Sequence, residues 1–192
     1  MVPEGASVET ESVSADIYID GLSGGRLSSS SVSGDLEVSA TSSAVEIESV
    51  SGDVVLEGSS PETSVESVSG EIELRGIYGE LGIATVSGDV DIDAGELSDA
   101  RFETVSGDLT ISASLSDGAR LSAESMSGDV SLTLPSSVSA RFEASSFSGD
   151  IDSEFREHDN HHSGNSVEFS VGGGSARVRL ESFSADIEIN SN

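Results

Sequence analysis

Apolar and polar residues recur along this chain around one five-residue phrase: Ser/Thr, apolar, Ser, Gly/Ala and Asp/Glu. The phrase occurs nine times, with its fourth residue at positions 15, 34, 52, 70, 88, 107, 128, 149 and 185. The first eight copies follow one another every 18 to 21 residues, and the last copy follows after 36. A period in this range indicates an internal structural repeat.

The spacing of apolar residues within each copy predicts β-strands. From Val50 to Leu56 every second residue is apolar or, at Gly52, small. This alternation is typical of a strand with one face buried, and it predicts that Val50 and Gly52 point to the interior. The step from Ile47 to Val50 is three residues, which predicts a bulge or corner at Glu48–Ser49. Helical spacing is found nowhere in the chain.

A unit of 18 residues with two short strands buries too little surface to fold alone, so the units must stack. The sequence therefore predicts an all-β fold, a single-stranded parallel β-helix (β-solenoid) of about nine coils of 18–21 residues. A right-handed winding follows from the general preference of parallel crossovers. The left-handed hexapeptide helix requires an aliphatic residue at every sixth position, and the step from Leu56 reaches Glu62. One domain is expected over residues 6–189, with little sequence left to cap either end.

The fourth residue of the phrase is always small. It is Ala15 in the first copy, Ala185 in the last, and Gly in the other seven: Gly34, Gly52, Gly70, Gly88, Gly107, Gly128 and Gly149. Because Ala is accepted twice, small size is the predicted requirement, rather than a left-handed backbone conformation. On this interpretation Gly88→Leu destabilises the fold strongly and Gly88→Ala only mildly.

One segment departs from the repeat. Between the last two copies the chain holds a polar stretch, residues 156–165, and then a strand-like Val167–Val171. We expect one overlong or doubled coil with a protruding loop. His158, His161 and His162 lie in that loop and are the only candidates for a transition-metal site. No metal site is predicted there, because nothing in the pattern brings the three side chains together.

Composition excludes several classes of function. The chain has 36 acidic residues against eight basic ones, all of them Arg, and a formal net charge of −28. Such a charge repels phosphate backbones and anionic membranes, so neither nucleic acid nor a membrane surface is an expected partner. The absence of Cys excludes disulfides and thiolate chemistry. No apolar run is long enough to insert into a membrane.

Stacking converts the outward residues of the phrase into columns along the rod. The first, third and fifth residues are predicted to point outward, which gives two hydroxyl columns and one carboxylate column. The carboxylate column contains Asp16, Asp35, Asp53, Glu71, Asp89, Asp108, Asp129, Asp150 and Asp186. Neighbouring charges about 4.8 Å apart repel by about 1 kcal/mol in water. We expect backbone N–H groups to offset this repulsion; a ladder of bound Ca²⁺ is the alternative.

No enzymatic activity is predicted. Ser, Asp and His all occur, but the repeat does not bring a nucleophile, a base and an orienting group together. The hydroxyl columns are similar to an ice-binding face, although such faces usually carry Thr and the first column holds only Thr85 and Thr104.

The phrase and the closing segment, residues 172–189, resemble a bacterial adhesin family, a domain of unknown function built from Ser/Thr-Val-Ser-Gly-Asp repeats. The resemblance covers about residues 6 to 189, and its departures are Ala15, Ala185 and Glu71. It implies an exported or membrane-tethered protein, and hence an extracytoplasmic location in the periplasm or at the cell surface.

The expected function is a non-enzymatic extracytoplasmic scaffold or adhesion-type module, with a cell-surface protein or a glycan as its partner. Two alternatives stay open. One is a structural solenoid that joins end to end through open coil ends, and the other is a solenoid that binds or processes polysaccharide.

Overall fold

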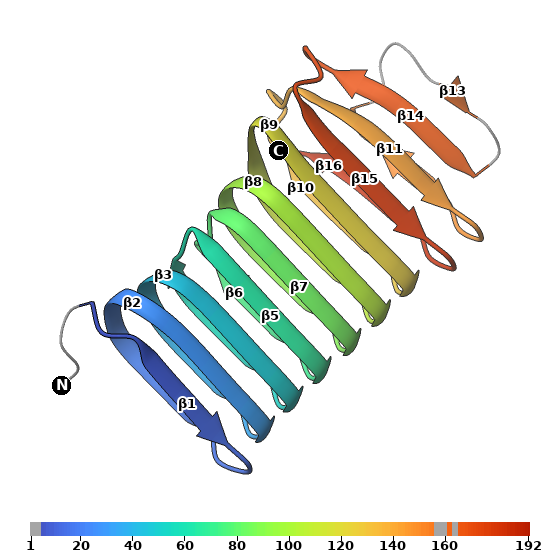
Figure 1. Cartoon of the computed structure of the whole chain (residues 1–192). Coiled ribbons are helices and arrows are strands. Elements are labelled where there is room, and N and C mark those ends of the chain that lie inside the picture. Colours follow the sequence, from blue (N-terminus) through green and yellow to red (C-terminus); the bar gives the residue numbers. More distant parts are fainter. Residues whose placement is uncertain (1–4, 156–160, 163–164) are drawn as a thin grey trace.

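The chain forms a parallel β-solenoid, as the repeat predicts (Figure 1). The computed structural model describes residues 5–155, 161–162 and 165–192. None of these residues forms a helix that is long and apolar enough to cross a membrane. Each turn has a strand segment that ends in the phrase, here called the phrase strand, and a following return strand, so the rod has a phrase face and a return face.

All strands of the described residues belong to one continuous sheet. They are β1 (Val8–Ser12), β2 (Ile17–Ser33), β3 (Leu36–Ser51), β4 (Val54–Ser59), β5 (Glu62–Ser69), β6 (Ile72–Arg75), β7 (Gly79–Ser87), β8 (Val90–Ser106), β9 (Leu109–Ser127), β10 (Val130–Leu134), β11 (Ala140–Ser146), β12 (Ile151–Ser153), β13 (His161–His162), β14 (Ser166–Val171), β15 (Ala176–Ser182) and β16 (Ile187–Ser191). The long strands β2, β3, β8 and β9 each bend once, so they supply a return strand of one turn and the phrase strand of the next.

About seven turns follow one another in sequence order. Their phrase strands lie in β1, β2, β3, β5, β7, β8 and β9, and each pairs in parallel with the next. The last two copies stack in reversed order. β15 lies between β9 and β11, and β16 lies between β10 and β12. The C-terminus is therefore found beside β9 and β16 and not at the end of the rod (Figure 1).

The C-terminal end of the stack is covered on its phrase face. β14 runs antiparallel to β11, and the ring of Phe169 stacks on Phe142 with centroids 4.7 Å apart. Phe155 stacks on Phe142 as well, at 5.8 Å. The expectation of an uncapped end is therefore wrong here, because the overlong segment folds back as a covering strand. Within the predicted loop 156–165, the backbone of His161–His162 pairs with β14, while residues 156–160, with His158, lie outside the described residues.

In the interior, buried apolar side chains form columns along the rod, and each coil contributes one residue to each column. On the return face the column consists of Leu36, Val54, Ile72, Val90, Leu109, Val130 and Ile187, all nearly fully buried. On the phrase face Ile47, Val65, Ile83 and Phe102 form the matching column. Each residue contacts its equivalent in the next coil, so hydrophobic burial stabilises the stack and not the single coil.

The predicted orientation of the first two phrase residues is wrong. Val50 is 47% exposed, whereas Ser49 is 5% exposed. β3 continues through Glu48–Ser49 without a bulge, and its pairing with β5 keeps one register from Ile47 to Ser49. The corner lies instead at the fourth and fifth phrase residues, between the end of β3 at Ser51 and the start of β4 at Val54, so the alternation of the phrase strand places Ser inward and Val outward.

The fourth phrase residue must be small, as the sequence predicts, and in most copies it must also adopt a positive φ. Six of the seven phrase glycines, from Gly34 to Gly128, have φ between 118° and 133°, a region that side chains rarely adopt. A Cβ on Gly88 would also lie 2.0 Å from the carbonyl oxygen of Gly70 in the preceding coil. The prediction that Gly88→Ala is mild is therefore wrong. Ala15, Ala185 and Gly149 do not have positive φ, so the turns near the two ends of the stack differ in conformation.

Candidate functional site: a groove along the phrase face

An apolar stripe runs the length of the phrase face. It consists of the second phrase residues in stacking order: Val13, Val32, Val50, Val68, Val86, Val105, Met126, Phe183 and Phe147. Their exposed fractions lie between 44% and 73%. In the described part of the chain, Tyr18 and Tyr78 are the only other large hydrophobic side chains with comparable exposure. The stripe is thus one continuous feature and not a scatter of surface residues.

The stripe ends in an aromatic pair. The rings of Phe183 and Phe147 are 4.9 Å apart and inclined by 5°, so they stack almost in parallel. Side-chain size therefore increases along the stripe, from Val through Met126 to Phe. A packed interior of equivalent coils does not tolerate such an increase without strain, which fits the exposed position of these residues.

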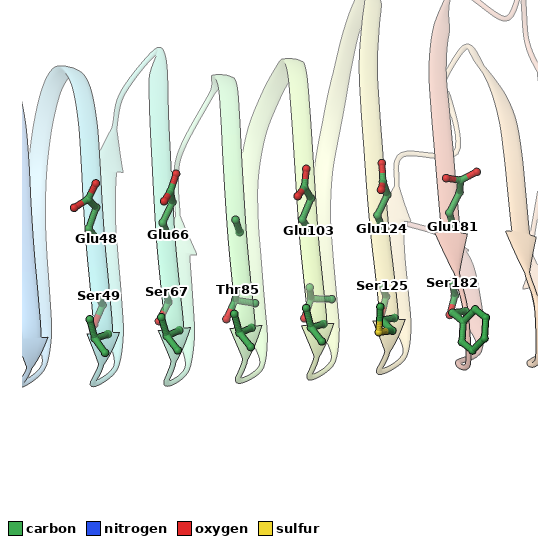
Figure 2. A pocket seen from close by; sticks show the side chains of 18 of the residues that line it. Glu48, Ser49, Glu66, Ser67, Thr85, Glu103, Glu124, Ser125, Glu181 and Ser182 are labelled. Atoms are coloured by element: carbon green, nitrogen blue, oxygen red, sulfur yellow. The ribbon is translucent and has the colours of Figure 1, made fainter.

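A row of carboxylates runs beside the stripe and is here called the Glu wall. It consists of Glu48, Glu66, Glu103, Glu124 and Glu181. Each lies two residues before a stripe residue, so both side chains point outward from the same strand. Figure 2 shows the row, which is interrupted at β7, where Ala84 replaces Glu.

The stripe and the Glu wall border a groove of about 1250 Å³. The floor of the groove is formed by the phrase strands at their first phrase residues, such as Ser49, Ser67 and Thr85. The lining residues come from phrase strands throughout the stack, from Ser12 in β1 to Ser146 in β11. The groove therefore follows the rod axis across the strands and suits a long occupant better than a compact one.

Ion pairing along the Glu wall is uneven. Glu103 pairs with Arg101 at 2.5 Å and Glu181 with Arg179 at 2.6 Å. Hydrogen bonds to these carboxylates raise the pKa of each Arg above its ordinary value. Glu48 and Glu66 have no ion pair within the described residues, and they face one another across β3 and β5. The least neutralised part of the wall is therefore at these two strands.

The carboxylate column of the phrase is held by the backbone of the adjacent coil. The Oδ1 atom of one Asp accepts the N–H of the fifth phrase residue in the next coil at 2.8–3.1 Å. The donor and acceptor pairs are Asp35 and Asp16, Asp53 and Asp35, Glu71 and Asp53, Asp108 and Asp89, Asp129 and Asp108, Asp186 and Asp129, and Asp150 and Asp186. A hydrogen bond to a charged group contributes about 1.5–3 kcal/mol, more than the repulsion of about 1 kcal/mol between neighbours. Across the described residues, no group of three His, Cys, Asp or Glu is arranged to hold a metal ion.

The phrase hydroxyls also bond within the fold. Ser51 Oγ donates to the carbonyl of Val32 in the preceding coil at 3.1 Å, and Ser69 Oγ donates to that of Val50 at 3.2 Å. At the first position, Ser125 Oγ donates to the Gly128 carbonyl of its own turn at 2.9 Å. The first hydroxyl column is buried, so the comparison with an ice-binding face does not hold.

Each phrase residue now has a structural role in a stack of parallel coils, and this repeat can be compared with known families. The model of the Toastrack DUF4097 domain matches residues 26–190. The chain belongs to the Toastrack DUF4097 family. Searches of curated proteins and of solved structures find no match. This domain is of unknown function, so the family supports a repetitive solenoid but neither the specific five-residue motif nor an adhesin identity.

The Toastrack domain has a second hollow, of about 640 Å³, lined by five of its eight Arg residues: Arg101, Arg120, Arg141, Arg177 and Arg179. Arg120, Arg177 and Arg141 occupy the same register position on β9, β15 and β11. Arg141 pairs with Glu143 at 3.6 Å and with Glu168. The acidic residues of the lining are Asp99 and Glu143, and Arg101 and Arg179 pair with Glu103 and Glu181, so the lining holds more Arg than acidic side chains.

Sequence reasoning placed the phrase correctly but missed the groove. The error concerned which face of the phrase strand is buried, because the sequence predicts Val50 inside and a bulge at Glu48. Two signals in the sequence could have revealed it. Glu recurs two residues before the apolar phrase residue in six copies, and β-branched Thr85 and Thr104 replace Ser at the buried position.

Proposed function

We propose that this Toastrack domain is a non-enzymatic, extracytoplasmic scaffold of adhesion type that holds an elongated partner in the groove. The observation that supports this proposal is the continuous apolar stripe. Soluble proteins rarely expose contiguous apolar surface on this scale, and where they do it marks an interaction site. Burial of the stripe would remove apolar area from water at about 25 cal/mol per Å².

A binding role fits the chemistry of the phrase face better than a catalytic one. Ser51, Ser69 and Ser125 donate hydrogen bonds to backbone carbonyls, and the Asp column accepts backbone N–H groups. Side chains that maintain the stack are poor candidates for a nucleophile or a base, since their loss would disturb the coil. The Glu wall and the stripe remain available to a partner.

The test compares beads that carry the domain with beads that carry the variant Val68→Ser/Val86→Ser/Val105→Ser. Both are applied to arrays of glycans and of peptides. The matched control is Tyr18→Ser/Tyr78→Ser, which removes two exposed aromatic side chains outside the stripe. We expect retention by the domain and the control, and loss of retention by the groove variant. Equal retention of all three, or no retention on either array, would overturn the proposal.

The same arrays separate the two kinds of partner. Retention on polysaccharides favours the glycan-binding alternative, and retention on peptides favours a protein partner. Thermal melts of the three proteins establish whether the groove variant is folded, and a serine variant of Val68 alone replaces it if the triple variant is not.

A further inference from the structure

We infer that the groove takes a basic amphipathic α-helix that lies along the rod with its apolar side on the stripe. This inference rests on the proposed function and names the class of its partner. The first argument is charge. On β3, β5, β8, β9 and β15 a residue of the Glu wall lies two residues before the stripe residue, and the Asp column follows three residues after the stripe at the turn. An occupant in contact with the stripe therefore meets carboxylates on both sides and needs cations on both flanks.

A second copy of this chain does not place cations against the groove when the two stripes face one another. The domain has no Lys, and its formal net charge is −28. If two stripes faced one another, the Glu wall of one copy would lie against the Glu wall or the Asp column of the other. Like charges in direct opposition are destabilising. The partner is thus a different polypeptide with Lys or Arg beside an apolar face.

The second argument is the spacing of the stripe. Its residues repeat with the coils, about 4.8 Å apart. An α-helix presents one apolar residue per turn of about 5.4 Å, whereas an extended strand presents same-side residues about 6.8 Å apart. Over four coils the helix departs from the stripe by about 2.4 Å and the strand by about 8 Å. A helix of four turns can therefore keep its apolar residues on the stripe, and an extended chain cannot.

The third argument locates the basic contacts. Glu103 and Glu181 already pair with Arg101 and Arg179, while Glu48 and Glu66 have no ion pair within the described residues. A helix over β3, β5 and β7 meets Val50, Val68 and Val86 below and these two carboxylates at its flank. We expect its cationic residues to contact Glu48 and Glu66.

The probe is a synthetic 18-residue helix of Leu and Lys with the Leu residues on one face. One control peptide has the same composition in scrambled order, and a second replaces Lys with Glu. Binding of each to the domain is measured by calorimetry at low and at physiological salt. We expect the amphipathic helix to bind, the scrambled peptide to bind at least about tenfold more weakly, and the acidic helix not to bind. Binding should weaken as salt rises, since its charged contacts are exposed.

The protein variants test the location. Glu48→Gln/Glu66→Gln should weaken binding about tenfold, through two exposed charge contacts. Glu37→Gln/Glu188→Gln removes the same charge from the return strands and should leave the affinity within about twofold. Val68→Ser/Val86→Ser/Val105→Ser should abolish binding. Equal affinity for the ordered and scrambled peptides, or indifference to both groove variants, would overturn the inference.

The two proposals can fail separately. If the groove variants lose retention on the arrays but still bind the helix as the unaltered domain does, the partner class is wrong and the binding scaffold stands. If neither retention nor helix binding depends on the groove, both proposals fail. If the helix binds in the groove and neither array retains the domain, the groove is a helix site and the broader adhesion role fails.

Discussion

The substitution Gly88→Ala tests the stacking geometry most directly. Gly88 has φ 122°, and its Cβ would lie 2.0 Å from the carbonyl oxygen of Gly70, which is backbone and cannot rotate away. Adopting this φ with a side chain costs about 1–3 kcal/mol. Opening the two coils to relieve the contact weakens neighbouring hydrogen bonds, each worth about 0.5–1.5 kcal/mol. We expect a loss of about 3–5 kcal/mol in the free energy of unfolding.

Gly82→Ala is the matched control, because Gly82 lies in β7, the strand that ends one residue before Gly88. Its φ is not positive, and the nearest atom to its Cβ would be Ser64 Oγ at 3.9 Å. Its stability should change by less than about 1 kcal/mol, since Ala is favoured over Gly within a strand. Gly149→Ala separates the two causes: φ is not positive there, but its Cβ would lie 2.2 Å from the Ala185 carbonyl oxygen.

Urea unfolding followed by circular dichroism gives the three free energies, and the m-values show whether the transitions remain comparable. A loss for Gly88→Ala of less than about 1 kcal/mol would refute the reasoning. The requirement would then be small size alone, and only Gly88→Leu would be severe. If Gly149→Ala costs as much as Gly88→Ala, the close backbone contact is the cause and the conformation is secondary.

Three further predictions concern the ends and the columns. Deletion of residues 172–192 removes β15 and β16 and leaves a gap of two coil spacings, about 9.6 Å, between β9 and β11. We therefore expect the copy at β11 and β12 to unfold, which hydrogen exchange would detect as lost amide protection. Retained protection there would contradict the reversed order of the last copies. Asp53→Asn replaces the charge-assisted hydrogen bond from the Glu71 N–H with a neutral one and removes one charge from the column. Because the charged hydrogen bond outweighs the repulsion, the free energy of unfolding should fall by about 0.5–1 kcal/mol at low salt, and by more at 1 M salt, where the repulsion is screened. A gain of stability at low salt in urea unfolding would mean that repulsion dominates the column. The first coil has three apolar residues that are only partly buried, Val8, Ile17 and Ile19. Any end-to-end association should therefore occur at this coil and strengthen with ionic strength. Light scattering that shows monomers at all salt concentrations would contradict this prediction.

The reversed order of the last copies shows a limit of repeat reasoning. Coils with the same phrase offer nearly the same pairing edge to any neighbour, so similarity alone does not say which coil lies beside which. The order is decided by β14, which turns the chain back antiparallel to β11 and covers the end with Phe169. The 36-residue spacing indicated an irregular coil, but an insertion of the last coil between two earlier ones depends on contacts far apart in sequence.

The sequence by itself determined the strands, the parallel stack and the carboxylate column. Those features depend on the period of the repeat and on the spacing of aliphatic residues, and both are local. It did not determine which face of the phrase strand is buried, because Ile47 and Val50 cannot both lie inside without a bulge, and alternation alone does not say which one yields. The tertiary structure decided it. Gly52, which has positive φ and lies against the backbone of the preceding coil, places the corner at the fourth and fifth phrase residues. Ser49 is therefore buried, Val50 faces water, and the groove forms.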